Sequence, residues 1–324
     1  MRELKTTEAV GKTLCQDITQ IIKGEKKGPV FRKGHVIREE DIPVLLSVGK
    51  DHIYIWEEGE DTLHENDAAA MLYEMGRSEN MHPSEVKEGK IEFIADCDGM
   101  LKIQSEKLFA LNSFGQMMMA TKKNHSFIKK GEVFAGTRII PLSIERKKME
   151  EVKKIAPEGG ILQLLPFEKK KVGLISTGNE VFYKRIQDTF TPVVREKLSL
   201  YPVEIIGHVT CPDDVEQEKE AIQDFLRQGA DLVICMGGMS VDPDDRTPLA
   251  IRLSTEEVVS YGAPVLPGSM FMLAYAKGKV PVLGLPGSIM FCPTTVFDLV
   301  LPRIMAGDIV KKEEIDALGE GGLL

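Results

Sequence analysis

Apolar and polar residues follow different patterns in the two halves of the chain. Before about residue 170, apolar residues alternate with polar ones, as at Ile91, Phe93 and Ala95, and this alternation predicts half-buried strands. After residue 171, apolar runs alternate with amphipathic stretches, which is typical of a parallel sheet with helices on both faces. The strands predicted there are 172–176, 203–209 and 232–236, and the helices between them are 190–200 and 213–227.

The fold class predicted from these patterns is α/β, a three-layer sandwich around a mostly parallel sheet, preceded by smaller mainly-β and α+β segments. In the β segment, Asp98-Gly99 predicts a hairpin turn between two alternating strands, and Met117 to Met119 predict core filling. The segments expected are an N-terminal α+β segment at 1–85, a small β domain at 86–145, a linker at 146–170, an α/β domain at 171–309 and a C-terminal tail at 310–324.

The most informative stretch is the loop that follows the uncharged run 232–236. Two glycines end this run, and because glycine has no Cβ, they allow the backbone to approach a ligand closely. Three carboxylates follow within seven residues, just past the expected carboxyl end of a strand, where they can hold a hard divalent cation and through it an anion. The glycines are Gly237 and Gly238, Ser240 follows them, and the carboxylates are Asp242, Asp244 and Asp245.

Three further glycine-bearing turns follow apolar runs. They are Thr177-Gly178 after the run 172–176, Gly268-Ser269 after 263–267, and Gly287-Ser288 after 281–286. If the four runs are neighbouring parallel strands, all four turns meet at one edge of the sheet. Backbone N–H groups near a helix start bind anions well, and a helix is predicted from Thr294 to about Met305. For either Pro-Gly copy alone, an ordinary turn is the simpler interpretation.

Charge and composition exclude several classes of protein. The net charge of -9 argues against a general nucleic-acid surface, which needs a basic field. No stretch has signal-peptide character and no run of 18 uncharged apolar residues occurs, so we expect a cytoplasmic protein without a membrane span.

Cysteine and histidine positions do not indicate a metal site. The five cysteines are scattered without a CxxC pair, which fits buried thiols in a reducing compartment better than zinc ligands or disulfides. His64, Glu65 and Asp67 begin a predicted helix over 63–75, and we interpret them as a solvated first turn rather than a ligand set.

An ordered set of motifs occurs in the second half of the chain. The motifs are Ser176-Thr177-Gly178-Asn179-Glu180, Ile186-Gln187-Asp188-Thr189, Asp213-Asp214, Gly237-Gly238-Met239-Ser240-Val241 with Asp245, and Leu285-Pro286-Gly287. Together they resemble the molybdopterin-binding domain shared by molybdopterin adenylyltransferases and molybdopterin molybdenumtransferases. The resemblance covers about residues 172 to 308, and the whole chain most resembles a compact bacterial subgroup of molybdopterin-binding proteins.

This resemblance implies residue roles and ligands. Asp245 and Glu180 would be catalytic, and Asp245 with Asp244 and Asp242 would hold Mg²⁺, which neutralises phosphate charge. Molybdopterin or its adenylate would be the ligand, with molybdate as a further substrate. A homo-oligomer and contacts with other cofactor-biosynthesis or molybdoenzyme proteins are expected. Residues expected to bind the pterin are Thr177, Gly178, Asp188, Gly237, Gly238, Ser240, Gly268, Ser269, Gly287 and Ser288.

The chain also departs from the molybdenumtransferase pattern. Ser269 and Pro248 stand where that family has lysines, and each lost charge-assisted hydrogen bond removes about 1.5 to 3 kcal/mol from anion binding. Three hypotheses follow from these features. The first is Mg²⁺-dependent molybdate insertion, the second is a non-catalytic carrier or sensor for a pterin or nucleotide, and the third is a structural or oligomerisation role alone.

Overall fold

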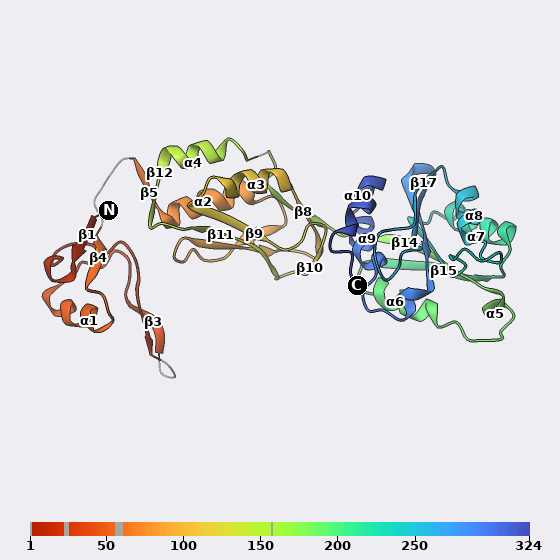
Figure 1. The fold of residues 1–324 in the computed structure, drawn as a ribbon, viewed down its shortest axis with the longest axis horizontal. Helices are drawn as coiled ribbons and strands as arrows, with labels where there is room; N and C mark the ends of the chain where they lie inside the picture. Colours follow the sequence, from red (N-terminus) through yellow and green to blue (C-terminus); the bar gives the residue numbers. More distant parts are fainter. Residues whose placement is uncertain (1, 23–25, 56–60, 157) are drawn as a thin grey trace. The chain divides into compact units, whose positions relative to one another are not determined.

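The computed structural model describes residues 2–22, 26–55, 61–156 and 158–324, shown in Figure 1. Contacts divide the chain into two compact units, which are described separately below. The first comprises residues 1–97, 101–124 and 128–164, and the second comprises 98–100, 125–127 and 165–324. No helix within the described ranges is both long and apolar enough to cross a membrane.

The first unit begins with small antiparallel sheets around a short helix. Strand β1 pairs with β4, and β2 pairs with β3. A cluster that includes Leu14, Ile37 and Leu45 forms the core of this region. The elements are β1 (Arg2–Lys5), β2 (Ile18–Ile22), β3 (Lys26–Phe31), α1 (Ile42–Ser47) and β4 (His52–Ile55).

The rest of the first unit is a four-stranded antiparallel sheet, in the order β6-β7-β11-β9, with α2 in contact with β7 and β11. Two further sheets have the orders β10-β8-β13 and β12-β5. The strands are β5 (Thr62–His64), β6 (Met81–Pro83), β7 (Lys90–Ala95), β8 (Gly99–Ile103), β9 (Met117–Thr121), β10 (Phe127–Ile128), β11 (Val133–Ile139), β12 (Ser143–Glu145) and β13 (Leu162–Pro166). The helices are α2 (Glu65–Gly76), α3 (Ser105–Ser113) and α4 (Arg146–Lys153).

Several predictions for this unit need correction. The hairpin across Asp98-Gly99 is wrong, because β7 pairs with β6 and β11 whereas β8 lies in another sheet. The solvated first turn expected for α2 is wrong for His64 and Glu65, which are buried, with His64 Nε2 2.9 Å from the carbonyl oxygen of Cys15. Asp67 is exposed, as expected. One core extends from Leu63 to Leu164, across the boundary expected at residue 85. The core role predicted for Met117 to Met119 is confirmed for Met117 and Met119, but Met118 is 39% exposed.

The second unit is built on a six-stranded sheet in the order β15-β14-β16-β19-β18-β17. Its elements are β14 (Lys170–Thr177), α5 (Asn179–Phe182), α6 (Phe190–Leu198), β15 (Val203–Cys211), α7 (Val215–Arg227), β16 (Leu232–Met236), α8 (Thr247–Ser254), β17 (Glu257–Tyr261), β18 (Met272–Ala276), β19 (Val280–Leu285), α9 (Val296–Met305) and α10 (Lys312–Asp316). The predicted α/β class is confirmed. The three strands predicted at 172–176, 203–209 and 232–236 are also confirmed.

The sheet is mixed: three of its five strand pairings are parallel and two are antiparallel. Strands β15, β14, β16 and β19 are parallel, but β18 runs antiparallel to both of its neighbours. The strand expected over 263–267 does not form. Pro264 and Pro267 lack the N–H group that a central strand must donate, and this segment instead connects β17 to β18.

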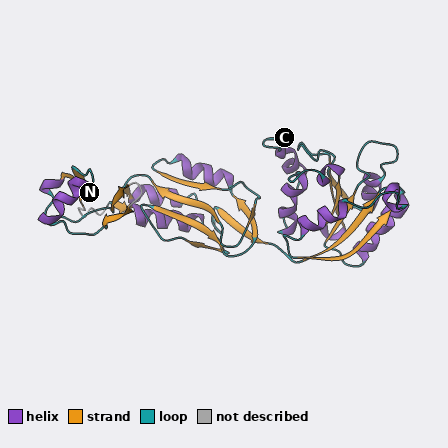
Figure 2. Cartoon of the chain, turned by 90° about the horizontal axis from the view of Figure 1, so that it is seen from below, coloured by secondary structure: helices purple, strands orange, loops and turns teal. Residues whose placement is uncertain are grey.

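Helices cover both faces of this sheet, as Figures 1 and 2 show. Successive strand residues point to opposite faces. Leu174, Ile234 and Leu283 therefore join a core with α6 and α9. Their neighbours in sequence, such as Ile175 and Cys235, join a separate core with α7 and α8. Burial on both faces explains why these strands are uncharged runs, and it fixes the turns that follow them at one edge.

Candidate functional site

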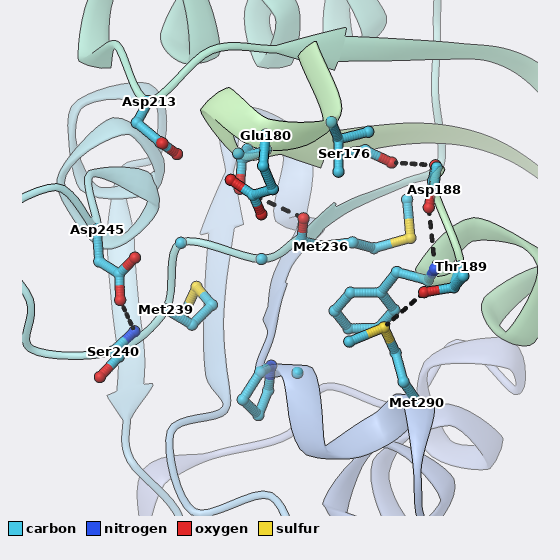
Figure 3. Close-up of a pocket in the computed structure, with 18 of the residues that line it drawn as sticks. Ser176, Glu180, Asp188, Thr189, Asp213, Met236, Met239, Ser240, Asp245 and Met290 are labelled. Carbon is cyan, nitrogen blue, oxygen red and sulfur yellow. Dashed lines mark hydrogen bonds between the residues drawn. The ribbon is translucent and has the colours of Figure 1, made fainter. Parts of the chain in front are cut away.

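A cavity of about 340 Å³ lies at the carboxyl ends of β14, β16 and β19. Because these strands are parallel, the turns that follow them meet there. Figure 3 shows acidic side chains on one side of the cavity and Asp188, Thr189 and Met290 on the other. The predicted site residues that line it are Thr177, Gly178, Glu180, Asp188, Gly237, Gly238, Ser240, Asp245 and Gly287.

Five predicted site residues do not line the cavity. Gly268 is buried, and a Cβ placed on it would lie 2.8 Å from Val296, so the residue serves packing near the start of α9. Ser269 belongs to the same connection between β17 and β18. That connection contains no strand, so Ser269 does not lie in a turn that follows a strand at this edge of the sheet. Asp242 and Asp244 are exposed on the loop outside the cavity. Ser288 is the second residue of a 3-10 turn that begins at Gly287, and its buried hydroxyl has no hydrogen-bond partner within the described residues.

Three carboxylates from three different turns line the acidic side. Glu180 lies in the short helix after β14, Asp213 follows β15, and Asp245 lies in the loop after β16. Two of them are held by backbone groups: Ser240 N–H donates to Asp245 over 2.8 Å, and Asn179 N–H donates to Asp213 over 2.9 Å. These contacts fix the carboxylates without neutralising them.

Burial and the neighbouring carboxylates together raise the pKa of Asp213. Burial raises the pKa of its carboxyl above the ordinary value, and the charges of Glu180, Asp245 and Asp244 raise it further. Among the described residues that line the cavity, none is a lysine or an arginine. The acidic side therefore has an unbalanced negative charge. The sequence motif contained Asp213, but its proximity to Glu180 and Asp245 depends on three strand ends that only the fold brings together.

Asp188 lies on the opposite side, in a hydrogen-bond network. It accepts from the N–H groups of Phe190 and Thr191, each over 2.9 Å, and from the hydroxyls of Ser176 and Thr191. Burial alone would raise the pKa of Asp188, but these hydrogen bonds outweigh it and lower the pKa. Asp188 is thus a fixed anion at one wall of the cavity.

His208 completes this network and was missed by sequence reasoning. Its Nε2 lies 2.9 Å from Ser176 Oγ and 3.1 Å from Thr191 Oγ1. Because both hydroxyls donate to Asp188, Nε2 must carry the proton and donate to them. Burial lowers the pKa of His208 and so favours the neutral ring. The parallel register of β15 with β14 places His208 here, a signal that one sequence does not contain.

The two glycines after β16 are required by packing. Gly237 and Gly238 have positive φ angles of 99° and 58°, which residues other than glycine rarely adopt. A Cβ on Gly237 would lie 2.8 Å from the carbonyl oxygen of Thr177, and one on Gly238 would lie 2.5 Å from Thr247 Oγ1. The sequence predicted close approach to a ligand. In the structure, the close neighbours of the turn are the end of β14 and the start of α8.

The remaining wall is apolar and rich in methionine. Met236, Met270 and Met290 line the cavity with Phe190 and Ile186. Methionine side chains adapt their shape to a flat or irregular partner. The cavity can therefore accept a ligand with an apolar ring at one side and a charged group at the other.

The predicted three-aspartate cation site is not assembled. Across the described parts of the chain, no group of three or more His, Cys, Asp or Glu side chains is arranged to hold a metal ion. Mg²⁺, however, commonly takes only one or two protein carboxylates and completes its shell with water and ligand phosphates. Glu180, Asp213 and Asp245 match that donor chemistry, and a cation beside them would offset the repulsion that raises the Asp213 pKa.

Comparisons with known proteins match parts of the chain. A family model described as a probable molybdopterin binding domain matches residues 173–306, and a model described as a domain of unknown function matches residues 3–57. A molybdopterin molybdenumtransferase of Synechococcus elongatus is 27% identical over 180 residues, which are 53% of this chain and 42% of that protein. The corresponding protein of Staphylococcus aureus strain Mu50 is 25% identical over 152 residues, 45% of this chain and 36% of that protein.

The chain thus spans about two fifths of the length of these curated relatives. Among solved structures, the molybdopterin biosynthesis enzyme MoaB from Thermus thermophilus is 26% identical and has a TM-score of 0.37. That match covers 41% of this chain and 91% of the MoaB chain.

Proposed function

We propose that the protein, whose residues 173–306 belong to the molybdopterin-binding domain family of molybdenum cofactor biosynthesis, binds molybdopterin or its adenylate in the cavity of the second unit. We further propose that it acts as a transferase of the molybdopterin molybdenumtransferase type, inserting molybdate with the help of Mg²⁺. Support comes from the relatives that bear this name and from the position of the cavity within the matched residues.

The observation that carries the proposal is the unbalanced acidic side of the cavity. Glu180, Asp213 and Asp245 converge there without a lysine or arginine among the lining residues. Such a surface repels a free phosphate but accepts a phosphate that arrives with a divalent cation. When bound, Mg²⁺ would neutralise the pyrophosphate of the adenylate and polarise the bond that breaks.

The chain's own groups would orient the ligand. Met236 and Met290 with Phe190 offer an apolar wall for the pterin ring, whereas Gly238 and Gly287 bring backbone close to its phosphate. Asp188, held by four hydrogen bonds, offers a fixed acceptor for the N–H groups of a pterin. These roles place the charged and apolar ends of the ligand at opposite sides of the cavity.

Release of AMP tests the proposed reaction. Purified protein is incubated with adenylylated molybdopterin, molybdate and Mg²⁺, and AMP is measured by chromatography. We expect Mg²⁺-dependent release that Asp245→Ala abolishes without loss of the folded state. Asp242→Ala is the matched control, because Asp242 lies in the same loop but is exposed outside the cavity, and it should keep full activity. Equal activity of the wild type and the Asp245→Ala variant would refute the transferase role.

One observation favours a second function, non-catalytic binding by a carrier or sensor. The cavity has no basic side chain to attract molybdate, which is an anion. The same assay separates the two functions, because a carrier would retain the adenylate tightly and release no AMP. Equilibrium dialysis with the adenylate and Mg²⁺ measures that retention.

A further inference from the structure

His208 contacts the network around Asp188 but is not among the residues that line the cavity. It lies in β15, the edge strand of the sheet, opposite Leu174 in the parallel register with β14. Its Nε2 lies 2.9 Å from Ser176 Oγ and 3.1 Å from Thr191 Oγ1. Asp188 Oδ2 lies 3.6 Å away, which is too far for a hydrogen bond. A hydrogen-bonded effect of His208 on Asp188 therefore passes through the two hydroxyls.

The hydroxyls of Ser176 and Thr191 are directed by Asp188. Both contact Asp188 Oδ2, at 2.9 Å and 2.5 Å. Burial raises the pKa of Asp188, but its hydrogen bonds outweigh burial and lower the pKa, so the ionised carboxylate can only accept. Each hydroxyl has one proton, and both protons are then directed to Asp188.

This arrangement leaves the two hydroxyl oxygens facing each other with lone pairs. They lie 2.9 Å apart, and Ser176 and Thr191 are only 3% and 5% exposed, so little room remains for water to separate them. Two oxygens at that distance repel when no proton lies between them. An Nε2–H group that donates to both oxygens offsets this repulsion. An unprotonated Nε2 would instead take one hydroxyl proton, and Asp188 would lose that hydrogen bond.

We propose that His208 is a positioning residue, whose Nε2–H orients the hydroxyls of Ser176 and Thr191 toward Asp188 and so fixes that carboxylate at the cavity wall. The inference rests on the proposed function, in which Asp188 accepts N–H groups of the pterin. His208 acts without touching the ligand, because it lies outside the lining of the cavity. It joins three segments at this wall: the edge strand β15, the end of β14 and the start of α6.

A base that activates Ser176 as a nucleophile is the other role that a distance of 2.9 Å would fit. That role needs the opposite tautomer, with the proton on Nδ1 and a bare Nε2 that accepts from Ser176. The contact between Ser176 and Asp188 argues against it, because the single Ser176 proton cannot be donated to both groups. The tautomer of His208 therefore separates positioning from activation.

The surroundings of His208 favour a neutral ring. Burial lowers its pKa, the charge of Asp188 raises it, and the charge of Arg195 in α6 lowers it. A neutral ring has one N–H, which the two hydroxyls require on Nε2. Protonation at acidic pH adds a proton to Nδ1 and leaves the Nε2–H in place. The orientation of the hydroxyls should therefore survive the titration of His208.

The tautomer of His208 tests the inference without any ligand. Long-range ¹H–¹⁵N spectra of the isotopically labelled full chain, recorded well above the ordinary histidine pKa, distinguish a protonated from a bare ring nitrogen. We expect the proton on Nε2 and a bare Nδ1. A proton on Nδ1 would overturn the inference and favour the activation of Ser176.

His208→Gln and His208→Asn form a matched pair of variants. Gln can place an amide N–H group near the position of Nε2, whereas the shorter Asn cannot. Carboxyl ¹³C titration then follows Asp188. We expect the Gln variant to keep the lowered Asp188 pKa of the wild type and the Asn variant to raise it toward the ordinary aspartate value. An Asp188 pKa that is the same in the wild type and the Asn variant would contradict the inference.

Calorimetric titration links the network to the ligand. Affinity for adenylylated molybdopterin with Mg²⁺ should fall about tenfold in His208→Asn, as for the loss of one hydrogen bond in a charged network, and should stay unchanged in His208→Gln. Full affinity of the Asn variant would refute the positioning role. A wild type that binds no adenylate would refute the proposed function alone, because the tautomer and the Asp188 titration still decide whether His208 orients the hydroxyls. The tautomer also decides if a variant fails to fold, since it is measured in the wild type.

Discussion

The two ends of the central sheet in the second unit differ in how they treat acidic side chains. At the amino ends of the strands, acids have partners: Glu168 pairs with Lys170 at 2.7 Å, Glu257 pairs with Lys279 at 2.6 Å, and Asp231 accepts from the Lys171 N–H. At the carboxyl ends, Glu180, Asp213 and Asp245 share a cavity whose lining contains no lysine or arginine.

The acids at the amino ends contribute to stability, whereas those at the carboxyl ends are candidates for function. Paired surface charges at the amino ends each contribute little, about 0 to 1 kcal/mol, but they avoid repulsion. The acids at the carboxyl ends repel one another, and this repulsion adds to burial in raising the pKa of Asp213. A chain selected for stability alone gains nothing from that repulsion. Perturbed carboxyl groups gathered in a cavity are therefore a candidate for ligand or cation binding.

The largest effect on stability should come from the glycine turns at the two ends. Gly238→Ala places a Cβ at φ 58° and 2.5 Å from Thr247 Oγ1. We expect it to lower the free energy of unfolding by about 2 to 4 kcal/mol, from backbone strain plus overpacking. Gly278→Ala is the control at the other end: its φ is 75°, but no atom lies within 4 Å of the added Cβ. Urea unfolding should show a loss of only about 1 kcal/mol there. Equal losses in both variants would contradict the tight packing of the Gly238 turn.

Neutralising an acid at the carboxyl ends should weaken ligand binding, whereas neutralising one at the amino ends should leave ligand binding unchanged. Asp213→Asn can keep the hydrogen bond from Asn179 N–H through its amide oxygen while removing one charge from the cavity. We expect affinity for adenylylated molybdopterin with Mg²⁺ to fall roughly 10- to 100-fold, as for the loss of one charged contact. Stability should rise slightly, because repulsion is relieved. Calorimetric titration and urea unfolding measure the two effects.

Glu168→Gln is the matched change at the amino ends. It should leave ligand affinity unchanged and lower stability by less than about 1 kcal/mol, because the ion pair with Lys170 is partly exposed. If both variants weaken binding equally, the acidic side of the cavity has no special role.

The last prediction concerns pH. The folded-state pKa of Asp188 is lowered, so its stabilising contribution is present above the ordinary aspartate pKa and is lost as pH falls through the lower folded value. Asp188→Asn should therefore be less stable than the wild type at pH 7, by about 1 kcal/mol for the lost hydroxyl contacts. The two proteins should approach equal stability only as pH falls through the lowered folded-state pKa of Asp188. A difference that stays constant with pH in urea unfolding would rule out this ionised role.

Sequence reasoning succeeded where one local signal was sufficient. The uncharged run 232–236 predicted a buried strand, and Gly237 and Gly238 marked its end, because a strand covered on both faces admits no charge. It failed over 263–267, where the apolar residues read as a strand although Pro264 and Pro267 interrupt the N–H ladder. It also missed β18, which is apolar throughout, but whose antiparallel direction has no sequence signature.

The sequence by itself determined which residues are turns, which runs are buried and which acids follow the strands, because those properties depend on near neighbours and on side-chain polarity. Only the tertiary structure decided that Asp213, and not Asp242 or Asp244, joins Glu180 and Asp245, and that His208 bonds to Ser176. Those partners are 32 or more residues apart in the chain. Their meeting depends on strand order and register, which are set by packing over the whole sheet rather than by any local pattern.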